Sequence, residues 1–129
     1  MGKIKIIFDI IDNKILLFHL LFTLIGAQVY EGYTLFSPNY VSDYKTFLLN
    51  NQQEVLHIWY QDSNAASMPY LLPDSSIIYP YVVDNPTMIG GGQGGGISKI
   101  NWNGSVIWDY TFANELYQQH HHIEPLPSE

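Results

Sequence analysis

Residues Ile100 to Tyr110 read INWNGSVIWDY, and residues Leu49 to Trp59 read LNNQQEVLHIW. Laid over each other without gaps, at a constant offset of 51 positions, the two stretches match in residue type at five positions, four of them apolar. The matched pairs are Leu49 with Ile100, Asn50 with Asn101, Val55 with Val106, Leu56 with Ile107, and Trp59 with Tyr110. The constant offset indicates that one structural unit occurs twice in the chain.

The later of the two stretches predicts a β-hairpin. Ile97 to Trp102 and Val106 to Thr111 are rich in β-branched and aromatic residues, and they flank Asn103-Gly104. Asn-Gly is the strongest short signal for a type I′ turn, because both central residues of that turn must tolerate positive φ. We therefore expect a strand on each side of a type I′ turn.

A second internal repeat pairs Leu72-Pro73-Asp74-Ser75 with Leu126-Pro127-Ser128-Glu129, at an offset of 54 positions. Strand-like apolar residues precede the first copy, so each repeat is expected to hold two hairpins. Four strands in about 50 residues is the pattern of a β-propeller blade. The sequence predicts an all-β fold of antiparallel four-stranded blades, with about one and a half blades in residues 28–129. A small β-sandwich is the alternative.

The size of the repeat also bears on the length of the protein. A single repeat of this kind cannot bury its apolar face, and at least about three are needed for a stable stack. We therefore expect these 129 residues to belong to a longer protein.

Composition agrees with a folded β-rich domain and excludes one class of partner. Aromatic residues make up 15% of the chain, and such residues favour pleated, half-buried surfaces. The formal net charge is -7 and the sequence contains no Arg. Beyond Lys14 only Lys45 and Lys99 carry positive charge, too few to neutralise a nucleic-acid backbone. A nucleic-acid-binding role is excluded, and the absence of Cys excludes disulfides and thiolate metal sites.

Residues 1–27 have the organisation of a signal peptide. Lys3, Lys5 and Lys14 precede the apolar stretch from Ile15 to Ile25, and the small pair Gly26-Ala27 follows. The stretch is shorter than the roughly 20 residues that cross a bilayer, so no stable membrane anchor is expected. We expect cleavage after Ala27 and an exported chain that is periplasmic, secreted or at the cell surface. A buried helix is the alternative.

The glycine-rich stretch from Gly90 to Gly96 reads GGGQGGG. Glycine loops can bring backbone N–H groups close to a phosphate or sulfate. Here no Lys-Ser or Lys-Thr follows and no helix is predicted after the loop, so a P-loop is excluded. The stretch is predicted to be a flexible loop between strands.

The run His120-His121-His122 is the best chemical candidate, since imidazole can transfer protons, bind metal or donate a hydrogen bond to an anionic oxygen. On a strand, His120 and His122 would share one face and His121 the other. Three ligands for one metal would then require a bend, and we predict no metal site. His57 and Asp109 are expected on strand surfaces without a catalytic role.

Several of these motifs together resemble the bacterial aryl-sulfate sulfotransferases, exported enzymes built on a six-bladed β-propeller. The similar segments are YTLFSPN (Tyr33 to Asn39), LLPDSS (Leu71 to Ser76), the glycine loop and, most specifically, KINWNGSVIWDY followed by HHHIEPLP. In that family a tryptophan-containing hairpin is followed about a dozen residues later by a histidine pair and then by Leu-Pro. Where the family commonly has His-His-Asp, this chain has His120-His121-His122.

The resemblance implies transfer of a sulfuryl group from a phenolic sulfate ester to a phenolic acceptor, through a covalent intermediate on histidine and without an organic cofactor. The partners it implies are a small aryl sulfate and a phenol. The family's nucleophilic histidine lies in a later blade, so no catalytic residue is assigned in these 129 residues. The resemblance assigns His120 and His121 to contacts with the sulfuryl group and leaves His122 unassigned. The alternative function is a non-catalytic, exported β-propeller that binds a ligand or protein.

Overall fold

The computed structural model describes residues 14, 30–39, 42–84 and 90–126. The chain divides into two compact units, Met1–Tyr30 and Glu31–Glu129. The predicted signal peptide lies outside the described residues, apart from Lys14. Within the described ranges, no helix has the length and apolar character needed to cross a membrane.

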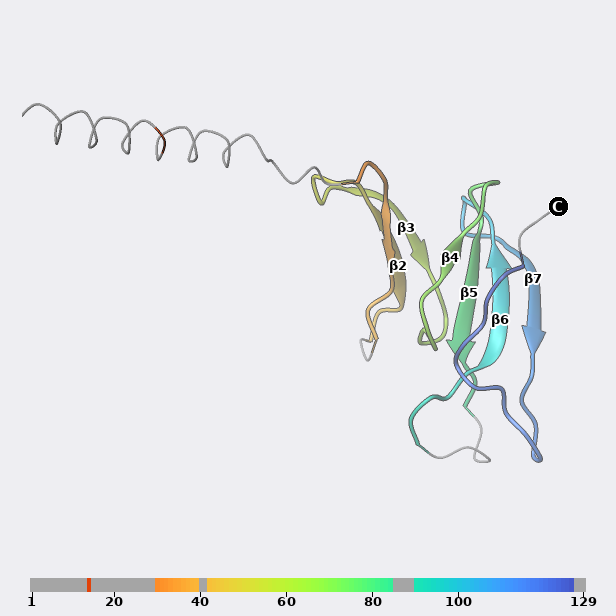
Figure 1. Cartoon of the computed structure of the whole chain (residues 1–129). Coiled ribbons are helices and arrows are strands. Elements are labelled where there is room, and N and C mark those ends of the chain that lie inside the picture. Colours follow the sequence, from red (N-terminus) through yellow and green to blue (C-terminus); the bar gives the residue numbers. More distant parts are fainter. Residues whose placement is uncertain (1–13, 15–29, 40–41, 85–89, 127–129) are drawn as a thin grey trace, which may run out of the picture. The chain divides into compact units, whose positions relative to one another are not determined.

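The unit Glu31–Glu129 contains two antiparallel sheets, shown in Figure 1. The first sheet has the order β1 (Thr34–Phe36), β2 (Lys45–Leu49) and β3 (Val55–Tyr60). The second has the order β4 (Tyr70–Leu71), β5 (Ile77–Val82), β6 (Gly95–Ile100) and β7 (Val106–Thr111). In both sheets each strand pairs with its neighbour in sequence. The prediction of an all-β fold with antiparallel sheets is confirmed.

The three hairpins β2–β3, β4–β5 and β6–β7 close with the same turn. The backbone N–H before each turn donates to the carbonyl four residues later: Asn50 to Glu54 at 3.1 Å, Leu72 to Ser76 at 2.8 Å, and Asn101 to Ser105 at 2.9 Å. The fourth residue of each turn has positive φ: 64° at Gln53, 63° at Ser75 and 88° at Gly104. One turn conformation therefore occurs three times in the unit.

The predicted type I′ turn at Asn103-Gly104 is wrong. Of these two residues only Gly104 has positive φ, whereas a type I′ turn needs it at both. The hairpin instead closes one residue earlier on the first strand, between Asn101 and Ser105. The Asn101 side chain fixes this closure, since its Oδ1 accepts a hydrogen bond from the Ser105 N–H at 2.8 Å. The strands predicted on either side are confirmed, although the first runs from Gly95 to Ile100.

A register shift recurs at the repeat offset. In β2–β3 it lies between Leu48 and Leu49, and in β6–β7 it lies between Lys99 and Ile100. Each pair of positions is separated from its counterpart by the same 51 residues. A bulge re-aims the side chains that follow it, so its place in a hairpin is a specific feature. The two hairpins thus share both a turn and a bulge.

The core joins side chains from both sheets. Leu48 and Trp59 of the first sheet form one buried cluster with Ala65, Ile77, Tyr79 and Ile100. The indole Nε1 of Trp59 donates to the Asn101 carbonyl at 3.0 Å. Burial of this apolar cluster is the main source of stability, and the hydrogen bond satisfies the one polar atom of a fully buried indole.

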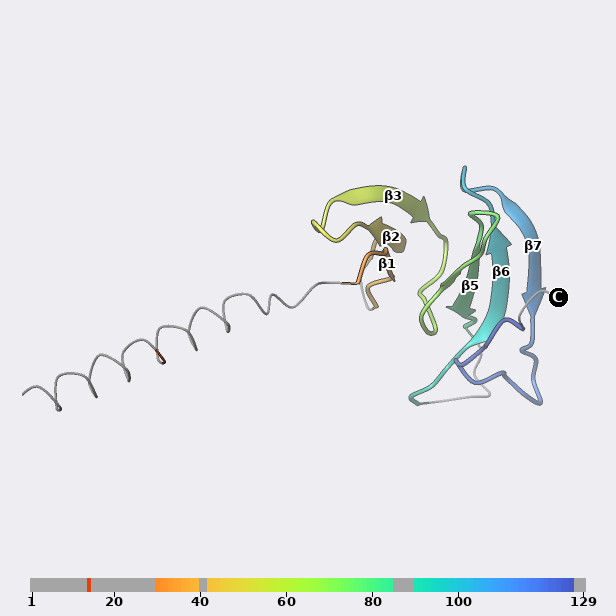
Figure 2. The ribbon, with the colours of Figure 1, turned by 45° about the horizontal axis from the view of Figure 1, so that its top comes forward.

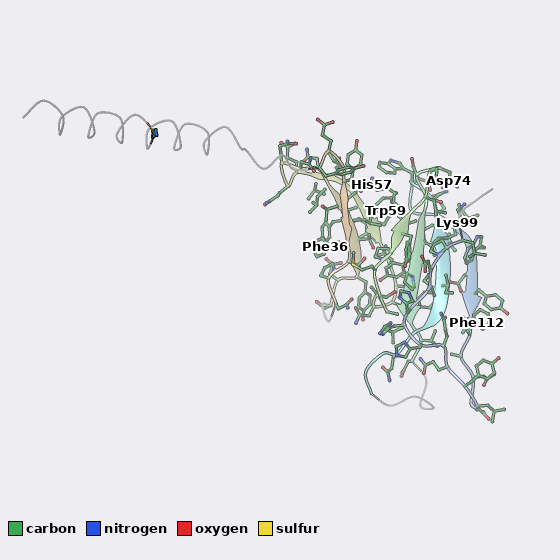
Figure 3. All side chains as sticks on the ribbon, in the orientation of Figure 1. Phe36, His57, Trp59, Asp74, Lys99 and Phe112 are labelled. Carbon is green, nitrogen blue, oxygen red and sulfur yellow. The ribbon has the colours of Figure 1, made fainter. Side chains whose placement is uncertain are left out.

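His57 belongs to this contact rather than to an open surface. Its ring stacks on that of Trp102 with centroids 3.9 Å apart, and it meets Trp59 edge-on at 4.3 Å. Figure 3 labels His57 and Trp59 on β3. The expectation of a strand-surface histidine is therefore corrected: His57 is half-buried. Its stacking partner, Trp102, lies in a turn 45 residues later in the sequence. No local sequence pattern predicts such a contact.

Candidate functional site

The segment that carries the histidine run turns back after β7. The Asn114 N–H donates to the Tyr117 carbonyl at 2.8 Å, and the Gln119 N–H donates to the Phe112 carbonyl at 2.9 Å. Figures 1 and 2 both show this segment returning to the end of the sheet where the chain enters β6. The turn therefore carries the histidines back to the glycine-rich loop.

The glycine loop and the histidine run lie side by side. Gln93 and His120 form an antiparallel bridge, and the His121 N–H donates to the Gly92 carbonyl at 2.9 Å. The two most distinctive stretches of the sequence are thus parts of one site. Sequence reasoning singled out both of them and did not connect them, because nothing local relates a loop before β6 to a segment after β7.

Two glycines allow this close approach. A Cβ on Gly92 would lie 2.2 Å from His120 Nε2, and the φ of Gly92 is +83°. A Cβ on Gly94 would lie 2.9 Å from the Cα of His121 and 3.0 Å from the carbonyl oxygen of His120. At Gly94 the nearest atom is backbone and cannot move aside, so the histidine segment fits against the loop there only because Gly94 has no side chain.

Gln118 ties the same loop to the end of β5. Its Nε2 donates to the carbonyls of Val83 at 2.9 Å and Gly94 at 2.8 Å. The Val83 N–H also donates to the Gly94 carbonyl at 3.0 Å. Gln118 was not singled out in the sequence, and its type carries no signal for this role. It fixes the loop from the side of the histidine segment.

The two predicted contact residues, His120 and His121, have adjacent rings. Their centroids are 4.1 Å apart and their planes meet at 49°. His120 is exposed and His121 is half-buried, with its Nδ1 covered and without a hydrogen-bond partner among the described residues. His122 is exposed. Two neighbouring imidazoles can offer N–H donors to one anionic group.

The histidine pair is not part of a metal centre among the described residues, where no three His, Cys, Asp or Glu side chains converge. The segment beyond the pair is held as well, since the Tyr70 hydroxyl donates to the Ile123 carbonyl at 2.7 Å. The histidines are thus fixed by the glycine loop on one side and by the β4 edge on the other.

Asp109 occupies a separate cavity of 320 Å³ with Tyr79 and Tyr81 in its wall. Its carboxylate accepts hydrogen bonds from the Tyr81 hydroxyl at 3.0 Å and from Ser98 Oγ at 2.5 Å. Burial raises the pKa of the Tyr81 hydroxyl, and the nearby carboxylate raises it further. Asp62 also lines this cavity, so its charge disfavours an anionic ligand. The cavity is a poor match to a sulfate ester.

Comparisons with known proteins add no relative: no family model, no curated protein and no solved structure matches the chain.

Proposed function

We propose that the two sheets are neighbouring blades of a β-propeller. The support is the repeat itself: a sequential four-stranded sheet, three identical hairpin turns, and a bulge that recurs after 51 residues. A small β-sandwich has no reason to repeat such details at a fixed offset. Repetition of one sheet in a single orientation is the defining property of a propeller.

The contacts between the sheets support the same architecture. His57 and Trp59 correspond by the repeat offset to Trp108 and Tyr110. The first pair is covered by Asn101 and Trp102 of the second sheet, whereas Trp108 is 43% exposed and Tyr110 is 53% exposed. Ile100 faces the core, so its neighbour Lys99 points to the opposite face of the sheet. Trp108 pairs with Lys99 and therefore lies on that opposite face as well. A further blade packed there would repeat the first contact.

We further propose that the chain contributes to an exported, arylsulfotransferase-like enzyme. The reaction is transfer of a sulfuryl group from a phenolic sulfate ester to a phenolic acceptor. The observation that carries the proposal is the histidine pair on the glycine loop, since His120 and His121 are adjacent and are held from two sides. The nucleophilic histidine is expected in a part of the propeller outside these 129 residues.

The chemistry of the pair fits this role. Sulfuryl transfer concentrates negative charge on the three peripheral oxygens, and fixed hydrogen-bond donors stabilise that charge better than mobile water. A histidine nucleophile would attack sulfur as the phenolate leaves, and the sulfohistidine would then pass the group to the acceptor hydroxyl. In this scheme His120 and His121 orient the sulfuryl oxygens and form no covalent bond.

A non-catalytic binding module is the second candidate. It is favoured by aromatic and aliphatic side chains that are exposed after the end of β7, near the histidines in sequence: Phe112, Leu116 and Tyr117. Such surfaces commonly mark binding sites for other molecules. Catalysis distinguishes the two functions directly.

The test is an assay of the complete protein with 4-nitrophenyl sulfate and a phenol acceptor. Acceptor-dependent release of 4-nitrophenolate is expected, and His120→Ala and His121→Ala should each lower the rate by about 10²-fold, as for loss of one charge-stabilising donor. His122→Ala is the matched control, with an expected change of less than about threefold, as for a residue outside the site. Release that does not depend on the acceptor, or an equal loss in all three variants, would contradict the proposal.

A further inference from the structure

The inference concerns which nitrogen of His121 carries its proton. The Nδ1 atom is covered and has no hydrogen-bond partner among the described residues, although the residue as a whole is only half-buried. The backbone on both sides of the ring is fixed, because the His121 N–H is bonded to the Gly92 carbonyl and its Cα lies against Gly94. The backbone that carries the ring is therefore held in place, and in this position the ring has its Nδ1 covered.

A covered nitrogen without a partner restricts the protonation state. Neutral imidazole has one N–H donor and one bare acceptor nitrogen, whereas imidazolium has a donor at both positions. Unpaired buried N–H groups are rarer in proteins than under-satisfied acceptors. The least costly state has a bare Nδ1 and the proton on Nε2.

We propose that the Nε2–H of His121 is the hydrogen-bond donor to the bound group, and that Gly94 is the positioning residue that holds the ring so. The identity of the group, a sulfate ester, rests on the function proposed above. The assignment of the proton to Nε2 rests on the covered, unpaired Nδ1. The role of Gly94 rests on its close approach to the backbone of His121.

Gly94 and Gly91 provide a matched pair for testing the positioning role. Neither has positive φ, so alanine is allowed by the backbone at both sites. A Cβ at Gly91 meets nothing within 4 Å, whereas at Gly94 it meets the backbone of His121 at 2.9 Å. Gly94→Ala must therefore displace the histidine, and Gly91→Ala leaves it in place.

The first measurement is ¹⁵N NMR of histidine-labelled complete protein, with His121 assigned by its loss in His121→Gln. At pH 8 we expect the His121 signals of a neutral ring protonated at Nε2. These signals should shift in Gly94→Ala and stay unchanged in Gly91→Ala. A ring protonated at Nδ1, or equal shifts in the two glycine variants, would overturn the inference whether or not the protein transfers sulfate.

The second measurement is binding of 4-nitrophenyl sulfate to the complete protein and its variants, followed by isothermal titration calorimetry. Gln places an amide N–H near the position of Nε2, whereas Asn places its amide near that of Nδ1. His121→Gln should therefore keep affinity within about threefold, and His121→Asn should lose at least about tenfold, the effect of one hydrogen bond to a charged group. The reverse order would overturn the donor assignment. Absence of any binding in a protein with the expected NMR signals would instead contradict the proposed function.

Discussion

At the scale of single residues, Asp74 and Lys99 form the ion pair most open to a pH test. Lys99 Nζ lies 2.8 Å from Asp74 Oδ2 and joins β6 to the turn before β5, as labelled in Figure 3. Ser76 donates to the other carboxylate oxygen through its backbone N–H at 3.1 Å and through its hydroxyl. The hydrogen bonds from Lys99 and then Ser76 hold the pKa of Asp74 well below its usual range.

The lowered pKa predicts a loss of stability in acid. Unfolded Asp titrates near pH 4, so the contribution of Asp74 is fully present above that pH. As the pH falls below about 4 toward the native pKa, the unfolded chain takes up the proton first and the contribution is lost. Asp74→Asn should therefore destabilise the protein at pH 7 and by less at pH 3, as measured by urea unfolding.

Exposed Asp62 supplies the control for this experiment. Asp62→Asn should change stability little at either pH. Added salt should reduce the effect of Asp74→Asn at pH 7, since an exposed pair is screened. An Asp74→Asn variant equally destabilised at pH 7 and pH 3 would contradict the role of the ionised carboxylate.

At the scale of elements, the hairpin turns offer a reciprocal substitution. Gln53 and Gly104 occupy the same turn position, and both have positive φ. A side chain in the left-handed region costs about 1 kcal/mol relative to glycine. Gly104→Ala should lower the free energy of unfolding by about 1 kcal/mol, because its Cβ meets nothing within 4 Å and only the backbone is strained.

Gln53→Gly is the opposite change at the same position. It should leave stability unchanged or raise it by a few tenths of a kcal/mol, because relief of strain is offset by the greater freedom of glycine in the unfolded chain. Urea midpoints measure both variants. A loss in Gln53→Gly as large as that in Gly104→Ala would mean that the two turns are not equivalent.

The turns also show how much of the fold the sequence predicts. β-Branched and aromatic residues on either side of Asn103-Gly104 indicated the strands, and the 51-residue offset indicated the repeat. The predicted turn type was wrong because the prediction considered only Asn103 and Gly104. The turn that forms has three residues between Asn101 and Ser105, and the Asn101 side chain stabilises it. The same turn at Asn50 forms without any glycine.

The site was predicted only in part. His120 and His121 stood out by residue type, and the glycines stood out by composition. Their contact was not predicted, because it depends on the chain turning back at Asn114 and on Gln118 reaching the Gly94 carbonyl. Such contacts depend on tertiary packing rather than on local patterns.

At the scale of the whole molecule, two residues at equivalent positions of the repeat differ in exposure, because one lies on a covered sheet face and the other on an exposed one. Trp59 is 1% exposed, and Tyr110, its counterpart in the repeat, is 53% exposed. In the 129-residue chain Trp59→Ala should cost about 3–5 kcal/mol, as for a large side chain removed from a core. Tyr110→Ala should cost less than about 1 kcal/mol.

Chemical unfolding of the two variants tests this contrast. A cost of several kcal/mol for Tyr110→Ala in the 129-residue chain would contradict its exposure there. In a longer protein with a further blade on this face, the proposed architecture predicts that the cost of Tyr110→Ala rises toward that of Trp59→Ala.

The contact between the two sheets is not self-complementary. The turn of one sheet, at Asn101 and Trp102, meets the third strand of the other, at His57 and Trp59. In the proposed propeller the sheets are copies in the same orientation, so any sheet added to cover Trp108 and Tyr110 would present a new face of the same kind. Such head-to-tail growth ends only when the last unit meets the first in a closed ring, and otherwise it continues as a filament. The angle between successive sheets, rather than the strength of any one contact, therefore decides between a soluble particle and an aggregate.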